Sequence, residues 1–396
     1  MACCGKQSEP AQYQGKGQGI PASGSLPRWG WARPRLTAYR PRGKGWWWRA
    51  LTRKHGVALI MVTFVVSLAT ILALHLAEAT FLKSRAIQLA EKQLRSEYLL
   101  KSLLSFGTGL IAADPDTSID SFSDSWGMFA HGQEVPPQIL GLDPGMRCYL
   151  QIIPQDAYLP AAVLAFSTSQ ASGGQGPSLD EKWRDVFRRF FEIALPADLQ
   201  LADDHLGVFK RSFGPTDMVA NLIDYLDIDQ KPYASQNYAG VESEQTSAYF
   251  RSDQRIDSLK ELARVPGFTP GRLRMLAPYL RVSGGAAQIN INVAPLLVIR
   301  ALHEDFFRNA DLAQQVFTIR NKEPFADIYD LAKRVPGIDP NLANDLQSFV
   351  RGGSQSFLIV GKVSFGNDET HYLRAAVSRG SSDRGEWPQV DSLELY

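Results

Sequence analysis

Cysteine is scarce in this chain, and its placement excludes a disulfide framework. Three cysteines occur among 396 residues. Cys3 and Cys4 precede the long apolar run, and Cys148 follows it. If the leader before this run stays behind or is removed, Cys148 has no partner within the chain. A lipoprotein signal at Cys3 and Cys4 is also excluded, because no apolar segment precedes them.

Recognisable catalytic motifs are missing as well. The six histidines are scattered, and neither a metal-ligand spacing nor a nucleophile elbow is present. The formal net charge of +1 gives no overall bias toward nucleic acid. We therefore expect a protein that is not an enzyme.

Charge is absent from one long stretch and is one-sided before it. Residues 57–77 contain no Asp, Glu, Lys or Arg, whereas residues 28–54 contain nine Lys and Arg side chains and no acid. About 20 helical residues cross a hydrocarbon layer of about 30 Å, so residues 57–77 predict a membrane span. Because basic flanks stay in the cytoplasm, we expect the bulk of the chain outside it.

Two other interpretations of this run are disfavoured. A cleaved secretory signal needs a shorter apolar core followed by a small-residue site, but the small residue here, Gly56, precedes the run. A buried helix of a globular domain is disfavoured by the length and uniform apolarity of the run.

Glycine and proline are missing from residues 57–106, so nothing interrupts a helix there. Beyond the span, Leu and Ala recur at three- and four-residue spacing, which predicts an amphipathic helix continuous with it. About 50 helical residues would reach about 75 Å. We expect the helix to stop at Gly107 and Gly109, ahead of Pro115.

A basic leader, a glycine, an apolar span and an amphipathic extension resemble the organisation of type IV pilin-like proteins. The resemblance implies prepilin-peptidase cleavage after Gly56 and a methylated Val57 at the mature N-terminus. Such proteins usually carry Glu at the fifth mature position, where this chain has Met61. A carboxylate in hydrocarbon needs a charged partner, so a subunit with no neighbour above it can omit this Glu. Met61 thus predicts a filament tip; otherwise it is a lipid-facing methionine in an unrelated protein.

The region after the helix predicts mixed structure. Residues 114–135 are rich in Asp, Ser and Gly and are expected to form a loop. Apolar segments at 146–153 and 161–166 have strand character. Residues 179–194 predict an amphipathic helix whose aromatic stripe belongs to a core.

The C-terminal third predicts three further elements and a tail. Alternating Ile and Asn at 289–292 indicate a short strand, and residues 294–307 indicate a helix with Pro295 in its first turn. Two strand-like runs joined by "GNDE" predict a hairpin within 356–379. We expect the polar tail after Gly380 to be loose.

Carboxylates cluster at the end of a predicted helix at 218–226 and in the following loop. Oxygen ligands of this kind suit a hard cation such as calcium. An EF-hand is excluded, because counting from Asp227 the fifth position is Lys231 and the sixth, where Gly is needed, is Pro232. Chemistry alone favours a solvated acidic loop and leaves a cation site open. The candidate ligands are Asp227, Asp229, Glu242 and Glu244.

An internal repeat follows. "SLKELARVPGFTPGRLRMLAPYL" begins at Ser258, and "DIYDLAKRVPGIDPNLANDLQSFV" begins at Asp327. Each copy predicts a helix, a tight Pro-Gly turn and a second helix. We expect each unit to bury its apolar face against the other copy.

Val-Pro-Gly turns also occur in helix-hairpin-helix modules, which bind DNA phosphates through backbone amides. Arg264, Arg272 and Arg274 give the first copy basic character, but the second copy carries several aspartates that would repel phosphate. The alternative function is therefore a membrane-anchored DNA-binding protein of an uptake system.

The order of these motifs resembles the minor pseudopilin K family of type II secretion systems, also called the general secretion pathway protein K family. The resemblance covers roughly Gly56 to Arg379. The segments that carry it are "LIDYLDID", "SLKELARVPG", "ININVAPLLVIRAL" and the second "VPGI".

This resemblance implies an α/β (α+β) fold. A pilin-like core of one long N-terminal helix and a small antiparallel sheet receives a large, mostly helical insertion with two SAM-like or helix-hairpin-helix-like units. The expected segments are a cleaved basic leader at 1–56, the N-terminal helix at 57–113, pilin-like strands and loops at 114–180, the inserted domain at 181–352, a β-hairpin at 353–380 and a flexible tail at 381–396.

The resemblance also implies a role. The family's subunits sit at the tip of the pseudopilus, nucleate its assembly and aid export of folded proteins across the outer membrane. The implied partners are the I- and J-type minor pseudopilins, the major pseudopilin, prepilin peptidase and the inner-membrane assembly platform, with no nucleic acid. The implied location is the bacterial inner membrane, crossed once, with the N-terminus cytoplasmic and the C-terminal domain periplasmic.

Calcium in the acidic loop is the cofactor that the resemblance implies. The family usually shows Gly-Ala-Glu-Asp in this loop, where this chain has Gly240, Val241, Glu242 and Ser243. Ser243 removes one acid, so the remaining carboxylates would have to complete the coordination.

Overall fold

The structure is a computed structural model of the chain. It describes residues 55–396 except for 142–145, 166–178, 228–231, 236, 242–255, 257, 283–286, 367–368 and 381–385. The chain divides into two compact units, with the division after Thr80.

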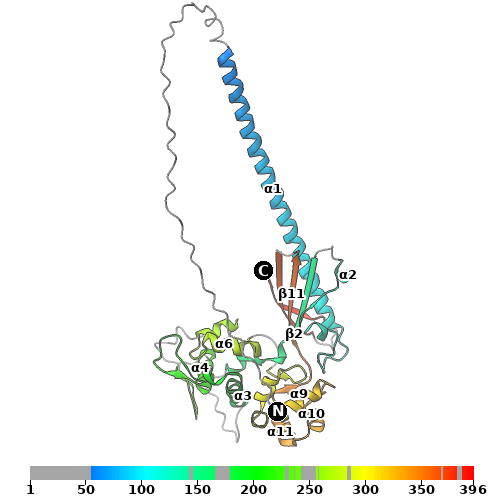
Figure 1. The fold of residues 1–396 in the computed structure, drawn as a ribbon. Helices are drawn as coiled ribbons and strands as arrows, with labels where there is room; N and C mark the ends of the chain where they lie inside the picture. The colour runs from blue at the N-terminus through cyan, green and yellow to red at the C-terminus, as the bar shows by residue number, and fades with distance from the viewer. Residues whose placement is uncertain are drawn as a thin grey trace, which may run out of the picture. The chain divides into compact units, whose positions relative to one another are not determined.

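The first long element is helix α1, which runs from His55 to Ala112 (Figure 1). The uninterrupted helix that the sequence predicts is thus confirmed. The expected stop at Gly107 and Gly109 is wrong, because α1 continues through both glycines to Ala112. A Cβ atom at Gly107 would lie 3.1 Å from Cδ1 of Ile359, so the glycine lets the helix approach the sheet closely.

The second unit contains a five-stranded antiparallel sheet in the order β1-β2-β11-β12-β13. The last turns of α1 cover one face of this sheet (Figure 1). The predicted strand at 146–153 and the predicted C-terminal hairpin are confirmed. The strands are β1 (Gln133–Glu134), β2 (Met146–Pro154), β11 (Ser356–Phe365), β12 (Glu369–Ser378) and β13 (Gln389–Leu395).

Alternation along the central strands builds the core beneath α1. Ile359 of β11 pairs with Ile152 of β2 and Ala375 of β12, and all three side chains are buried. Leu100 and Leu103 of α1 belong to the same apolar cluster. Cys148 lies in this core; burial is the main cause that raises the pKa of its thiol to about 11 and keeps it protonated.

The end of the chain corrects one expectation. The tail after Gly380 was expected to be loose, but residues 389–395 form β13 along the outer side of β12. Tyr396 extends the pairing, because its N–H donates to the carbonyl of Tyr372 at 3.0 Å. Backbone hydrogen bonds to β12 hold this segment in the sheet. The polar side chains of the segment gave no sign of this pairing.

The rest of the second unit is mostly helical and has its own apolar core. Its aromatic centre comes from α3, where Trp183, Phe187, Phe190 and Phe191 are fully buried, as the sequence predicts. The helices are α3 (Leu179–Ala194), α4 (Pro215–Leu226), the 3-10 helix η6 (Leu259–Arg264), α6 (Pro270–Leu276), α7 (Leu296–Leu302), α8 (Glu304–Arg308), α9 (Ala310–Arg320), α10 (Ile328–Arg334) and α11 (Pro340–Leu346).

Short elements fill the connections between these parts. The short helices are α2 (Pro137–Leu140), η1 (Gly127–Phe129), η2 (Gln155–Ala157), η3 (Ala161–Leu164), η5 (Ala197–Leu199) and η7 (Ala277–Tyr279). The two-stranded pairs are β3 (Leu159–Pro160) with β8 (Leu280–Arg281), β9 (Ile289–Asn290) with β10 (Val350–Arg351), β4 (Ala202–Asp203) with β5 (Ser212–Phe213), and β6 (Ala234–Ser235) with β7 (Tyr238–Ala239).

Three expected elements differ from the structure. Residues 114–135 were expected to form a loop, but residues 127–129 form the 3-10 helix η1 and residues 133–134 form strand β1. The segment 161–166 was expected to be a strand, but residues 161–164 form the 3-10 helix η3. The expected helix at 294–307 is broken at His303, whose φ of −139° and ψ of 154° are extended. His303 Nδ1 accepts the N–H of Asp305 at 3.2 Å, so this residue caps α8 and starts a second helix.

The long helix, the antiparallel sheet and the mostly helical region confirm the predicted α+β class. The boundaries expected for the domains stay predictions.

Candidate functional site

The start of α1 presents apolar side chains in every direction. Within residues 57–77, Val57 is 57%, Met61 65% and Leu72 70% exposed. By its length and composition α1 could cross a membrane. A helix that is apolar all round needs lipid or protein around it.

The residues expected to guide processing lie at the beginning of α1. The helix begins at His55, so Gly56 and Val57 fall in its first turn, and Met61 follows about one turn later. Among the residues that the structure describes, no other group lies within 4 Å of the position that a Cβ atom would take at Gly56. Cleavage after Gly56 stays a prediction.

The expected calcium ligands are only partly within the described residues. Asp227 caps the C-terminal end of α4, and its side chain is buried. Asp229, Glu242 and Glu244 lie outside the described residues. The structure therefore places one of the four candidates at the predicted helix end.

The loop that leads to the other candidates folds back onto α4. Oδ1 of Asp224 accepts the N–H of Tyr233 at 2.6 Å. A Cβ atom at Gly240 would overlap Oδ2 of Asp224, so only glycine fits at this contact. The N–H of Gly240 also donates to the carbonyl of Tyr233 at 2.8 Å. Gly240, two residues before Glu242, is thereby held against the helix whose end carries Asp227.

Two tyrosines fix this loop to α3. The hydroxyl of Tyr238 donates to Oδ1 of Asp185 at 2.7 Å, and Arg184 lies over the Tyr238 ring at 4.4 Å. Arg184 Nη1 also donates to the hydroxyl of Tyr233 at 3.0 Å. Burial is the first cause that raises the pKa of the Tyr238 phenol, so it remains a donor at neutral pH.

The two Val-Pro-Gly turns have the same conformation but different surroundings. Gly267 and Gly337 adopt φ values of 92° and 98°, which favour glycine. The first turn, residues 265–268, is buried, and its Pro266 carbonyl accepts Nδ2 of Asn221 at 3.0 Å. The second turn exposes Pro336 and Gly337. The backbone amides of the first turn are therefore not available to a phosphate.

Arg272 supports the same conclusion about the first repeat. Its side chain is fully buried, although the sequence suggests a basic surface. Its guanidinium donates to the carbonyls of Leu199, Gly267, Gln200 and Phe213 at 2.7–3.0 Å. Arg272 thus holds backbone together inside the protein. Both observations disfavour DNA binding by this unit.

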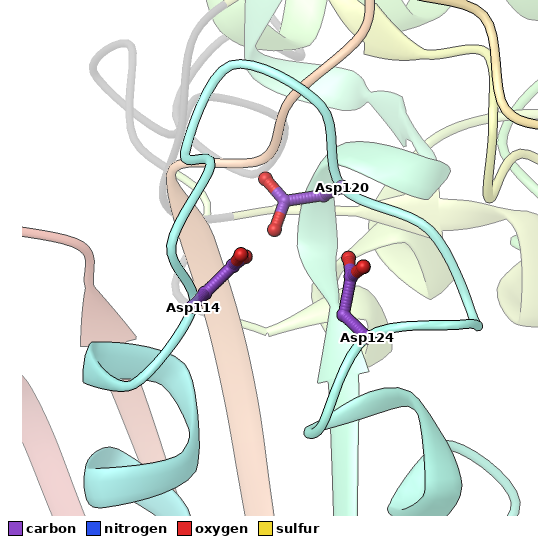
Figure 2. A group of neighbouring side chains, drawn as sticks. All are labelled: Asp114, Asp120 and Asp124. Carbon is purple, nitrogen blue, oxygen red and sulfur yellow. The ribbon is translucent and has the colours of Figure 1, made fainter.

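The structure gathers a cluster of carboxylates that the sequence analysis missed. Asp114, Asp120 and Asp124 place one oxygen each within 4.8 Å of the others (Figure 2). Nη2 of Arg379 lies 3.1 Å from Asp114 and 2.7 Å from Asp120. The sequence predicts only a loop at residues 114–135, where the aspartates lie. Arg379, the cation that pairs with two of them, lies 255 or more positions further along the chain. Because this guanidinium already lies against two of the three carboxylates, we assign no metal ion to the cluster.

A second buried carboxylate joins the helical region to the sheet. Asp156, with no exposed surface, lies between Arg281 of β8 and Arg351 of β10. Its Oδ2 also accepts the N–H groups of Gln355 at 2.6 Å and Ser356 at 3.2 Å. One side chain therefore holds two strands of the helical region and the beginning of β11.

Comparison with known proteins gives one kind of match. No family model matches the chain, and no curated protein matches it by sequence. In structure, the chain is similar to a chain of the GspK-GspI-GspJ complex from the type 2 secretion system of enterotoxigenic Escherichia coli. The TM-score is 0.56 at 14% sequence identity, and the match covers 78% of this chain and 99% of that chain. The likeness shows the fold, and it is the fold implied by the sequence resemblance.

Proposed function

We propose that this chain is a non-enzymatic minor pseudopilin at the tip of a type II secretion pseudopilus. It nucleates filament assembly and thereby aids export of folded proteins across the outer membrane. The observation that carries the proposal is the fold, in which a helix with an apolar, exposed start leads into a small sheet with a mostly helical insertion.

The apolar start of α1 serves as anchor and as filament stem. It crosses the bacterial inner membrane once, with the basic flank cytoplasmic and the bulk of the chain periplasmic. Prepilin peptidase cleaves after Gly56, and the amine of Val57 becomes methylated. Exposed apolar side chains between residues 57 and 77 are covered by lipid before assembly and by helices of the major pseudopilin and other subunits after it.

The tip position rests on Met61. A carboxylate at this place would need a cation from a subunit above, and methionine needs none. The chain can therefore start a filament on the inner-membrane assembly platform without leaving a charge unpaired in the membrane.

The partners follow from the structural likeness. The similar chain comes from a complex of GspK, GspI and GspJ. By analogy, this chain associates with I- and J-type minor pseudopilins and then with the major pseudopilin. No role for nucleic acid is proposed, because the turn of the first repeat and its Arg272 are buried.

Calcium fits the residues at the end of α4. The donors there are carboxylate oxygens, which calcium prefers, and Gly240 brings the loop back to the helix that carries Asp227. Asp227, Asp229, Glu242 and Glu244 would hold the ion. When bound, calcium would cross-link the helix end to the loop and so add to the stability of the folded region.

The function is tested by co-expressing the full-length chain with the I- and J-type minor pseudopilins of the same cell. After extraction in detergent, the tagged chain is expected to retain both partners through gel filtration. DNA binding is measured on the same preparation over a range of salt concentrations. Failure to retain either partner, together with salt-dependent DNA binding, would overturn the proposal in favour of the uptake function.

A further inference from the structure

The loop after α1 encloses more negative charge than its one guanidinium neutralises. Three carboxylates, from Asp114, Asp120 and Asp124, converge there (Figure 2). Only Arg379 among the described residues forms an ion pair with them. If all three carboxylates were ionised, the cluster would carry a net charge of −2.

The burial of these side chains makes the excess negative charge unfavourable in free energy. The side chains of Asp120 and Asp114 are 0% and 3% exposed, and that of Arg379 is 7% exposed. Like charges repel strongly at this spacing when water is excluded. Burial is the largest cause that raises the pKa of Asp120 to about 7, against the opposing attraction of Arg379. Burial also raises the pKa of Asp124.

Asp120 lies where the helical region returns to the sheet. Its Oδ2 accepts the N–H of Ser354 at 2.5 Å, and its own N–H donates to the carbonyl of Gly352 at 3.0 Å. Nδ2 of Asn290 bridges the carbonyl of Asp120 at 3.1 Å and Oγ of Ser354 at 2.8 Å. The junction segment, residues 352–356, is thus attached to the loop by both backbone and side chain.

Two further contacts tighten the junction segment. A Cβ atom at Gly353 would lie 2.7 Å from the carbonyl oxygen of Thr117, so there is no room for any other side chain. The N–H of Arg379 donates to the carbonyl of Gln355 at 2.7 Å. A change in the charge of the cluster therefore acts directly on the end of α1, the junction segment and the end of β12.

We propose that Asp120 keeps a proton, donated to an oxygen of Asp114, that fastens the junction segment, and that the junction loosens when this proton is lost to solvent. While the proton is bound, Arg379 contacts both carboxyl groups. After the proton leaves, two buried carboxylates repel each other across a single guanidinium. The end of α1 and residues 352–354 are then held less firmly.

Among the described charged groups around the cluster, none supplies a second positive charge to it. The proton therefore offsets part of the excess negative charge. Asp124 faces it from the same loop and adds a further negative charge. Asp156, which accepts the N–H groups of Gln355 and Ser356 in the junction segment, is paired with Arg281 and Arg351. Glu386, whose backbone packs against Gly380 beside Arg379, is exposed. Asn290 and Ser354 contribute hydrogen bonds but no charge.

The direction of the pH effect follows from proton linkage. The folded state keeps the Asp120 proton up to about pH 7, whereas an unfolded Asp releases it near pH 4. Between these values the folded state binds more protons than the unfolded state. The folding equilibrium constant therefore falls as pH rises, by up to about tenfold per pH unit for this proton, and the effect ends above about pH 7.

The test compares Asp114→Asn with Asp116→Asn in the full-length chain in detergent micelles. The amide introduced by Asp114→Asn can donate to Asp120 in place of the proton, whereas Asp116 is exposed and lies outside the cluster. Urea unfolding between about pH 5 and pH 8 gives the folding constant of each variant relative to wild type. For Asp114→Asn we expect this ratio to rise at least about tenfold with pH, and for Asp116→Asn to stay nearly constant. Parallel behaviour of the two variants would overturn the proposal.

Infrared spectroscopy of the wild-type chain tests the same proton without a substitution. A protonated carboxyl group has a carbonyl band that a carboxylate lacks, and exposed Asp and Glu are ionised near pH 6. We expect such a band at about pH 6 and its loss by about pH 9. Its absence at pH 6 would overturn the proposal even if Asp114→Asn failed to fold. Neither outcome depends on the role of the chain in secretion.

Discussion

Arg379 and Asp120 lie 259 positions apart in the chain and form an ion pair, with 2.7 Å between Nη2 and Oδ1. The pair connects the end of β12 to the loop after α1. Nearly all of both side chains is buried, so each charge depends on the other for compensation.

Replacing Arg379 with methionine is expected to destabilise the protein strongly. At about pH 8 the loss should be about 3–5 kcal/mol of unfolding free energy, because buried carboxylates would remain without their cation. At about pH 5 the loss should be smaller, since protonated carboxyl groups need no cation. Urea unfolding at the two pH values measures both. Arg374→Met, an exposed change on β12, should cost less than about 0.5 kcal/mol.

Substitution of Asp156 should destabilise the protein about as much as substitution of Arg379. Asp156→Ala would leave Arg281 and Arg351 without their shared carboxylate and the N–H groups of Gln355 and Ser356 without their acceptor. We expect a loss of about 3–5 kcal/mol in unfolding free energy. Asp330→Ala breaks a more exposed pair with Arg334 on α10, and should cost only about 0.2–1 kcal/mol. Equal losses in the two variants would show that Asp156 does not hold the junction.

The same Gly→Ala substitution should cost more stability in the first Val-Pro-Gly turn than in the second. Both Gly267→Ala and Gly337→Ala place a side chain at positive φ, a strain of about 1–2 kcal/mol. At Gly267 the new Cβ would also lie 3.0 Å from Phe213 and 3.1 Å from Met218 in the core. At Gly337 its nearest neighbour would be Leu312 at 3.3 Å. Thermal melting should therefore show a larger loss for Gly267→Ala, and the reverse order would contradict the packing of the first turn.

Removal of calcium is expected to lower the melting temperature. An ion that binds only the folded state at about 100 times its dissociation constant adds about 2.7 kcal/mol of stability. Chelator should remove this increment from the wild-type chain, and added calcium should restore it. Asp227→Asn should melt lower and respond less to chelator, whereas Asp330→Asn should respond as wild type does. An identical melting temperature with and without chelator would exclude the site.

Local patterns in the sequence were enough to predict α1, α3, β2 and the C-terminal hairpin. Each has a periodicity or turn signal that can be recognised without knowing its neighbours. The repeated Val-Pro-Gly turns also predicted two similar units, and the positive φ at Gly267 and Gly337 agrees with that prediction. The order of the motifs was enough for the fold class.

The rest depended on contacts between distant parts of the chain. Arg379 and Arg351 lie 259 and 195 positions from the aspartates that they bind, and no local pattern pairs them. Arg272 looks like a surface residue in its helix but is buried by carbonyl groups from other segments. β13 is held by the edge of β12 rather than by its own side chains. These features follow from tertiary structure, which overrides local propensity.

The most direct test of the pseudopilin assignment is the mass of the mature N-terminus. The chain is purified from membranes of cells with and without prepilin peptidase, and its N-terminal peptide is measured. We predict a chain that begins at Val57 and carries one added methyl group when the peptidase is present, and an uncut chain when it is absent. An intact leader in cells that contain an active peptidase would contradict the account.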